Sequence, residues 1–185
     1  RGHFDESLNI RSLERFLSDQ GNVDITRYFP IHSKKENIAV IGSGPAGLGA
    51  AYHLARLGYR VTIFEAKSEL GGMLRYGIPP YRLPRSILDS EIERITSLGI
   101  QIGLETTLGK DLSWKDLESF DAVFISIGLQ LGTIPFETDG SEDDILTGVD
   151  FLADPRKWSL EDDTQRTLII GGGNVAIDVA RTLMR

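Results

Sequence analysis

The chain has 185 residues with 27 acidic and 20 basic side chains, so its formal net charge is −7, and 41% of its residues are hydrophobic, enough to bury a core. The acidic balance argues against a nucleic-acid partner, because phosphates need a basic face. The absence of cysteine excludes a disulfide framework, thiolate ligation of a metal or iron–sulfur cluster, and thiol catalysis within this stretch.

The first third of the chain predicts a helix followed by a β–α–β unit. Apolar residues at helical spacing predict a helix over residues 7–20, and residues 26–36 form a connector. The apolar run at 38–41 is typical of a strand buried on both faces of a parallel sheet. A helix over 45–57 and a strand over 60–65 complete the unit.

The rest of the chain continues to alternate between helices and strands. Adjacent glycines at 71 and 72 and a proline-rich segment over 77–84 form the next loop. Two pairs have the spacing of a capping box, Ser86 with Asp89 and Ser113 with Asp116. The expected helices cover residues 87–98, a short stretch up to 119, and 174–184, and the expected strands cover 100–104, 122–128 and 167–170.

Two acidic runs, 137–144 and 161–163, predict solvated loops, with a docking surface for a basic partner as the alternative. No signal peptide is visible at the N-terminus. The most apolar window, residues 38–57, is interrupted by glycines and Pro45 and carries two basic residues. We therefore expect a cytoplasmic protein without a membrane partner.

A glycine motif lies between the first strand and its helix. Residues 42–47 read GSGPAG, which places glycine in a G-x-G-x-x-G pattern. The first glycine permits a tight turn, the second lets the backbone approach a pyrophosphate, and the third allows close helix–strand packing. Glu65 ends the next strand 18 residues after Gly47, where a carboxylate accepts hydrogen bonds from a ribose 2′-hydroxyl. The motif predicts a dinucleotide site that disfavours a 2′-phosphate, and the alternative is a purely structural glycine turn.

The same motif occurs a second time. Sliding the sequence by 129 positions places residues 42–47 on residues 171–176, which read GGGNVA between an expected strand and an expected helix. The repeat predicts the start of a second nucleotide-binding unit. Asp178 and Arg181, three residues apart on that helix, are interpreted as a surface ion pair rather than as catalytic groups.

No side chain is predicted to carry out catalysis. The chain contains no Walker phosphate loop and no recognisable Ser–His–Asp arrangement. His3, His32 and His53 share no ligand spacing, so we expect no metal site. The chemistry therefore has to belong to a cofactor.

Together these motifs resemble the NAD(P)H-dependent FAD oxidoreductases of the glutamate synthase small-subunit family. The resemblance extends to the flavin part of dihydropyrimidine dehydrogenase and, more distantly, to adrenodoxin reductase. Residues 8–17 are similar to the helix that follows the family's iron–sulfur segment, 40–48 to its FAD fingerprint, and 171–178 to its NAD(P)H fingerprint. The most specific signature is GGML at 71–74 with GIPPYRLP at 77–84, which generic Rossmann proteins lack.

The resemblance implies FAD at the first site and a nicotinamide nucleotide at the second. The 42–47 turn would face the pyrophosphate, Glu65 the adenosine ribose, and Leu108 the adenine. For Arg82 the alternative is a surface arginine in a proline-rich loop. The implied cofactor-binding residues are Gly42, Ser43, Gly44, Pro45, Ala46, Gly47, Glu65, Ala66, Gly72, Met73, Leu74, Arg82, Leu108 and Gly128 for FAD, and Gly172, Gly173, Asn174 and Val175 for the nicotinamide nucleotide.

The expected fold is α/β. Residues 1–36 would form a helical segment and linker, 37–150 an incomplete Rossmann-like FAD-binding domain, and 151–185 the start of a Rossmann-like NAD(P)H-binding domain. In the family the nucleotide domain is inserted into the flavin domain, whose last portion returns afterwards, so we expect a fragment of a longer protein.

The function implied by the resemblance is hydride transfer from NAD(P)H to FAD. Single electrons would then pass to an iron–sulfur segment or subunit outside this chain, since the family's cluster cysteines are absent here. A disulfide reductase would need a redox cysteine pair soon after Glu65, and the chain has none. The alternative is a non-catalytic or degenerate flavodomain that acts as a structural module of a larger complex.

Overall fold

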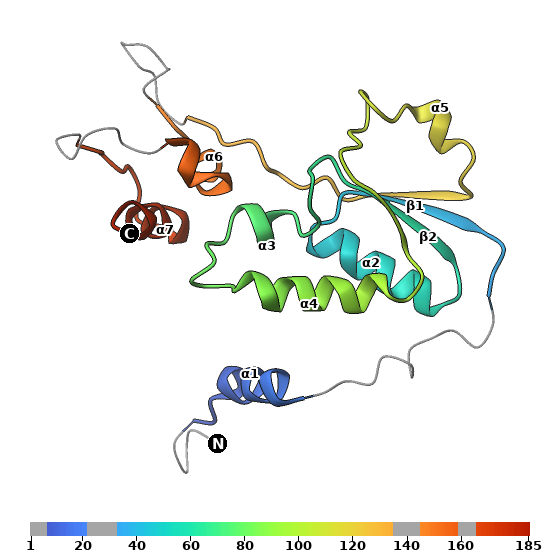
Figure 1. Cartoon of the computed structure of the whole chain (residues 1–185), viewed down its shortest axis with the longest axis horizontal. Coiled ribbons are helices and arrows are strands. Elements are labelled where there is room, and N and C mark those ends of the chain that lie inside the picture. The colour runs from blue at the N-terminus through green and yellow to red at the C-terminus, as the bar shows by residue number, and fades with distance from the viewer. Residues whose placement is uncertain (1–6, 22–32, 135–144, 159–165) are drawn as a thin grey trace.

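A computed structural model describes residues 7–21, 33–134, 145–158 and 166–185 (Figure 1). Its centre is a four-stranded parallel sheet in the order β3-β2-β1-β4. The interpretations of His3, His32 and the two acidic runs fall outside the described residues. The strands are β1 Asn37–Ile41, β2 Arg60–Phe64, β3 Gln101–Gly103 and β4 Ala122–Ile125.

Helices connect and cover these strands. Helix α2 joins β1 to β2, as the β–α–β prediction requires, and the parallel pairing of β1 with β2 confirms that unit. Three short helical elements, α3, α6 and a 3-10 turn at Pro155–Trp158, were not expected from the sequence. The helices are α1 Ile10–Gln20, α2 Pro45–Arg56, α3 Met73–Tyr76, α4 Arg85–Thr96, α5 Trp114–Leu117, α6 Gly148–Ala153 and α7 Asn174–Leu183.

The central strand β1 is buried on both faces of the sheet. Its Val40 packs into a cluster with residues of α2 and α4, which lie on one side of the sheet in Figure 1. Its Ala39 and Ile41 pack on the other side with Leu112 and with Leu117 of α5. A strand with apolar neighbours on both sides needs an uninterrupted apolar run, which explains the sequence of β1.

Strand β4 is shorter and more exposed than the sequence predicted. It ends at Ile125 rather than at residue 128, and the side chains of Phe124 and Ile125 are 42% and 51% exposed. Among the described residues β4 pairs with β1 alone, so it forms an edge of the sheet. Its apolar residues therefore lack a second covering layer within the described part of the chain.

The expected strand over 167–170 is wrong, because the structure gives this segment no strand hydrogen bonds. Leu168 and Ile170 are 84% and 68% exposed. A strand exists only when a neighbouring strand satisfies its backbone groups, and no described segment pairs with this one.

One of the two expected capping boxes forms and the other does not. In α5 the Ser113 hydroxyl accepts from the Asp116 backbone N–H at 3.3 Å, and the Asp116 carboxylate accepts from the Ser113 N–H at 2.8 Å. Helix α4 instead begins after Pro84 without a side-chain cap. Asp89, the expected second member of that box, forms an ion pair with Arg75 instead.

Helix α6 crosses the expected domain boundary at residue 150. Its Phe151 and Leu152 form a small apolar cluster with Val179 of α7. Helix α6 therefore packs with the helix of the second glycine motif (Figure 1). Helix α1, by contrast, has all its residues exposed, including Leu13, Phe16 and Leu17.

Candidate functional site

The candidate site lies at the carboxyl edge of the parallel sheet. The turn at 42–47 follows β1, Glu65 and Ala66 follow β2, Leu108 comes after β3, and Gly128 comes after β4. Parallel strands end at one edge, so the fold gathers residues that are up to 86 positions apart in the sequence. Ligands of open α/β sheets bind at this edge.

The three motif glycines serve different purposes in the turn. Gly42 has a φ of +96°, and a Cβ there would lie 2.4 Å from the Ser126 carbonyl oxygen. A Cβ at Gly47 would lie 1.9 Å from the Gly42 carbonyl oxygen. A Cβ at Gly44, however, would meet no protein atom within 4 Å. The packing of the protein therefore requires the first and third glycines, whereas the second faces open space.

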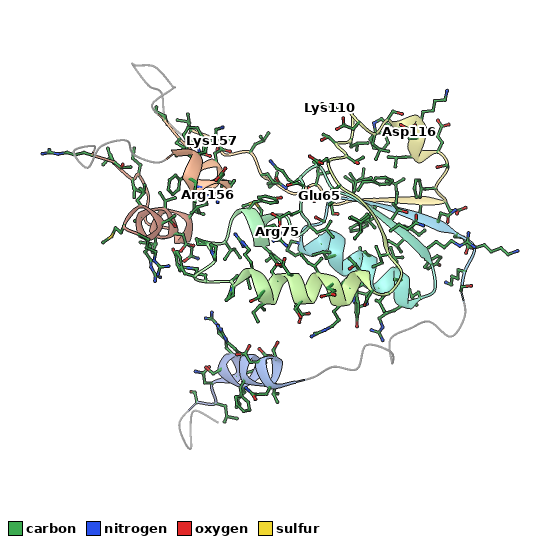
Figure 2. All side chains as sticks on the ribbon, viewed as in Figure 1. Glu65, Arg75, Lys110, Asp116, Arg156 and Lys157 are labelled. Carbon is green, nitrogen blue, oxygen red and sulfur yellow. The ribbon has the colours of Figure 1, made fainter. Side chains whose placement is uncertain are left out.

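Glu65 lies beside this turn and is 4% exposed (Figure 2). Its Oε2 accepts hydrogen bonds from the backbone N–H of Ser43 at 2.9 Å and from the Ser43 hydroxyl at 2.5 Å. Its Oε1 accepts from the backbone N–H of Lys67 at 2.9 Å. The carboxylate thus joins the end of β2 to the turn after β1.

The glycine-rich loop at 71–74 packs directly on the same turn. The Gly71 N–H donates to the hydroxyl and the carbonyl oxygen of Ser43, at 3.1 and 3.2 Å. Gly72 has a φ of +51°, and a Cβ there would lie 2.7 Å from the Gly44 Cα. Met73 and Leu74, both half-buried, then begin α3. The two expected parts of the FAD site are therefore in contact.

Arg75 of α3 is a buried residue that the sequence analysis did not single out (Figure 2). Its Nε donates to the Leu70 carbonyl oxygen at 2.6 Å, its Nη1 lies 3.2 Å from Glu69, and its Nη2 pairs with Asp89 of α4. Through its contacts with Leu70, Glu69 and Asp89, Arg75 fixes the preceding loop against α4, and no motif spacing marks it for this role.

The neighbouring Arg85 has a pKa below its ordinary value. Burial is the main cause, and the positive charge of Arg75 lowers this pKa further.

The second glycine motif has the same local form as the first. Gly171 has a φ of +128°, and its counterpart Gly42 also has a positive φ. Gly173 is the N-cap of α7, in the same way that Gly44 is the N-cap of α2. Neither helix has a side-chain hydrogen bond at its cap. A Cβ at Gly172 or at Gly173 would meet nothing within 4 Å. Each helix therefore presents an open N-terminus of the kind that binds a phosphate.

The predicted second-site residues lie together on this open N-terminus. Gly172, Gly173, Asn174 and Val175 are all exposed. In the first motif Pro45 and Ala46 are exposed in the same way.

The remaining residues predicted for FAD differ in burial. Leu108 is half-buried and packs on the apolar cluster that contains Ile41, and Ala66 is exposed. Gly128 has a φ of +69°, and a Cβ there would meet nothing within 4 Å.

Asp178 is not part of a surface ion pair with Arg181, contrary to the sequence interpretation. Its side chain is 8% exposed, and its Oδ1 lies 2.8 Å from the Arg82 Nε and accepts from the Tyr81 hydroxyl at 2.9 Å. The Arg181 guanidinium instead lies over the Tyr81 ring, 4.7 Å from its centroid. The proline-rich loop folds back onto α7 and covers Asp178, which sequence spacing could not reveal.

Among the described residues, no group of three or more histidine, aspartate or glutamate side chains is arranged to hold a metal ion. No helix in this part of the chain is both long enough and apolar enough to cross a membrane.

Comparison with known proteins gives a family match and several curated relatives. The sequence pattern described as pyridine nucleotide-disulphide oxidoreductase matches residues 36–185. The beta subunit of an NADP(+)-dependent formate dehydrogenase from Moorella thermoacetica is 41% identical, over 100% of this chain and 30% of that protein. The PreT subunit of an NAD-dependent dihydropyrimidine dehydrogenase from Escherichia coli K12 is 40% identical, over 99% of this chain and 45% of that protein. The chain spans less than half the length of these relatives.

A solved structure and one further curated relative are also similar to this chain. Mycobacterium tuberculosis FprA in complex with NADPH matches with a TM-score of 0.68 and 25% identity, over 80% of this chain and 36% of that one. The NADPH-Fe(3+) oxidoreductase beta subunit of Geobacter sulfurreducens adds a further relative at 38% identity, with 100% of this chain and 29% of that protein covered.

Proposed function

Because the chain belongs to the pyridine nucleotide-disulphide oxidoreductase family, whose flavoproteins bind FAD and NAD(P)H, we propose that it forms the FAD site and the start of the nicotinamide-nucleotide site of an NAD(P)H-dependent oxidoreductase. The match covers both glycine motifs. The function of the whole protein is part of this proposal, since the relatives are more than twice as long as the chain.

The observation that carries the proposal is the open space above Gly44. A Cβ at this position would touch no protein atom, although the neighbouring Gly72 approaches the Gly44 backbone closely. At the open N-terminus of α2, a glycine that the protein's own packing does not require is explained by a ligand whose pyrophosphate approaches the backbone there. The uncapped N-terminus of α2 supplies the N–H donors.

The surroundings of Gly44 suit the remaining parts of FAD. Three donors occupy the Glu65 carboxylate, which has about four lone-pair positions, so one remains for a ribose hydroxyl. The Ser43 side chain, bonded to Glu65 and Gly71, holds the three segments in one arrangement before any ligand binds. We propose that Met73 and Leu74 line the flavin side, that Arg82 contacts FAD, and that Leu108 lies near the adenine.

The second site is proposed at the N-terminus of α7. Support comes from the repeat of the local geometry at Gly171 and Gly173 and from the likeness to an NADPH-bound structure. Because α6 packs on α7 through Phe151 and Leu152, we place the start of this second unit at Gly148 rather than at residue 151.

A bound FAD would supply the chemistry, namely acceptance of a hydride from NAD(P)H and release of single electrons. This chain's residues bind and orient the two nucleotides, and none needs to act as an acid or a base. The chain has no cysteine, so it supplies no redox disulfide despite the family's name. We propose that the acceptor is an iron–sulfur segment or subunit, in agreement with the relatives that are named as subunits. A cytoplasmic location stays a prediction.

The test is spectroscopic. The purified full-length protein is expected to be yellow and to lose its flavin absorbance anaerobically when NADH or NADPH is added. Gly44→Val should abolish FAD binding without unfolding the protein, because a Cβ at this position meets no protein atom within 4 Å and the side chain would occupy the space proposed for the pyrophosphate. Gly49→Ala, which also meets nothing within 4 Å, is the control and should keep its flavin.

The alternative, a structural module without redox function, predicts a different result. A colourless protein, or one whose bound flavin is not reduced by either nucleotide, would contradict the proposed activity. Retention of stoichiometric flavin by Gly44→Val would show that the site is misplaced.

A further inference from the structure

We infer that Asp178 is a positioning residue, which holds Arg82 in place for FAD from helix α7 of the nicotinamide-nucleotide unit. This inference rests on the proposed function and goes beyond it. It assigns a role to a buried carboxylate that belongs to neither glycine motif and that the hydride transfer itself does not use.

The contact joins segments that are far apart in the chain. Asp178 lies in the middle of α7, whereas Tyr81 and Arg82 lie in the proline-rich loop between α3 and α4, 97 and 96 positions earlier. The Asp178 side chain is 8% exposed and the Arg82 side chain is 39% exposed. A nearly buried carboxylate needs partners, and this loop provides a charge and a hydroxyl.

The geometry of the pair leaves part of the guanidinium available. Asp178 uses Oδ1 for both partners, at 2.8 Å from the Arg82 Nε and 2.9 Å from the Tyr81 hydroxyl. An arginine side chain has five N–H donors, and the ion pair with Asp178 is formed at Nε. The terminal nitrogens of Arg82 form no hydrogen bond with any described residue. Asp178 therefore fixes the direction of Arg82 and leaves its terminal nitrogens for an anionic or polar ligand.

The loop is also held from its other side. The guanidinium groups of Arg181 and Arg185 lie 4.7 and 3.9 Å from the centroid of the Tyr81 ring. Within the loop, the backbone N–H groups of Arg82 and Leu83 donate to the Pro79 carbonyl oxygen at 2.9 and 3.2 Å. These contacts bind the loop to α7 as a unit, so a change at Asp178 is transmitted to Arg82.

The test is a double-mutant cycle on FAD affinity in the purified protein. Asp178→Ala and Arg82→Ala should each raise the dissociation constant of FAD roughly tenfold, and the double variant should be no weaker than Arg82→Ala alone. Asp178→Asn, which keeps an acceptor oxygen, should recover part of the loss. Glu91→Gln removes an exposed ion pair of α4 with Arg94 and serves as the matched control, with no expected change.

Hydrogen exchange in the FAD-free protein gives a readout that is independent of the flavin. Asp178→Ala should raise the exchange rate of the Arg82 and Leu83 amides, and Glu91→Gln should not. The inference is overturned if Asp178→Ala leaves FAD affinity unchanged, if Arg82→Ala has no effect, or if the two losses multiply as independent effects. If the unaltered protein binds no FAD, both the proposed function and the role of Asp178 toward FAD are overturned. A faster amide exchange in Asp178→Ala would then show that the contact only joins the loop to α7.

Discussion

Single residues at the carboxyl edge of the sheet hold this site together before a ligand arrives. Ser43 is the centre of that arrangement, because its backbone and hydroxyl contact Glu65 and its oxygen atoms accept from the Gly71 N–H. Every one of these groups is buried, so each hydrogen bond also satisfies an atom that water cannot reach. The fingerprint turn is therefore a preformed part of the fold.

The two glycines in the first half of α2 give a residue-scale prediction. Gly47→Ala should lower the free energy of unfolding by about 2 kcal/mol or more, because its Cβ would lie 1.9 Å from the Gly42 carbonyl oxygen. Gly49→Ala in the same helix should raise it by about 0.5–1 kcal/mol, because alanine is the better helix former and the position is open. Urea denaturation measures both. Equal effects of the two substitutions would contradict the close packing of α2 on the turn.

At the scale of elements, α3 and its loop depend on one buried cation. Arg75→Met should lower the free energy of unfolding by about 2–3 kcal/mol, because Leu70 loses a donor and Glu69 and Asp89 lose their shared partner. Arg94→Met on α4 is the matched control and should cost less than about 1 kcal/mol, because its pair with Glu91 is exposed. Chemical denaturation compares the two, and an equal loss would argue against the role of Arg75.

Helix α5 gives a pH-dependent prediction. The hydrogen bonds from Ser113 lower the pKa of Asp116 from its ordinary value. A carboxylate with a lowered folded pKa stabilises its helix above its ordinary pKa, and that stabilisation is lost as the pH falls through the folded pKa. Ser113→Ala should therefore raise the exchange rates of the α5 amides roughly fivefold at neutral pH.

The same substitution should have a smaller effect in acid, once the pH has fallen below the lowered pKa of Asp116 and its carboxylate has taken up a proton. Hydrogen exchange followed by mass spectrometry, at neutral pH and again at successively lower acidic pH values, provides the comparison. An effect of the same size at all these pH values would show that the carboxylate does not take part in the cap.

At the scale of the whole molecule, we expect that each of the two proposed nucleotide sites stabilises the folded full-length protein when its own nucleotide binds. FAD at 100 times its dissociation constant contributes about 2.7 kcal/mol if it binds the folded state alone, which raises Tm by roughly 5–10 °C. Gly44→Val should abolish the shift with FAD and keep a shift with NAD(P)H, and Gly173→Val should do the reverse, because both new side chains enter open space.

Differential scanning fluorimetry of the three proteins with each nucleotide measures these shifts. Loss of both shifts in either variant would mean that the two motifs do not form separate sites. In the proposed function the sheet and α2 form the first site, and α7, which packs on α6, forms the second.

The sequence by itself determined the β–α–β unit and both glycine motifs, because each can be recognised from a short stretch of sequence. The uninterrupted apolar run of β1, the positive φ of Gly42 and the cap at Ser113 each have a pattern that spans only a few residues. The family resemblance added the loop at 71–74, which the structure brings into contact with the first motif through Gly72.

Only the tertiary structure decided the features that depend on distant neighbours. The segment 167–170 has the composition of a strand but no partner among the described residues, and β4 lies at an edge that its apolar sequence does not reveal. Asp178 has helical spacing to Arg181 but contacts Arg82 instead, because the loop before α4 folds onto α7. Local patterns specify turns, caps and periodicity, whereas burial and charge pairing follow from which segments the fold brings together.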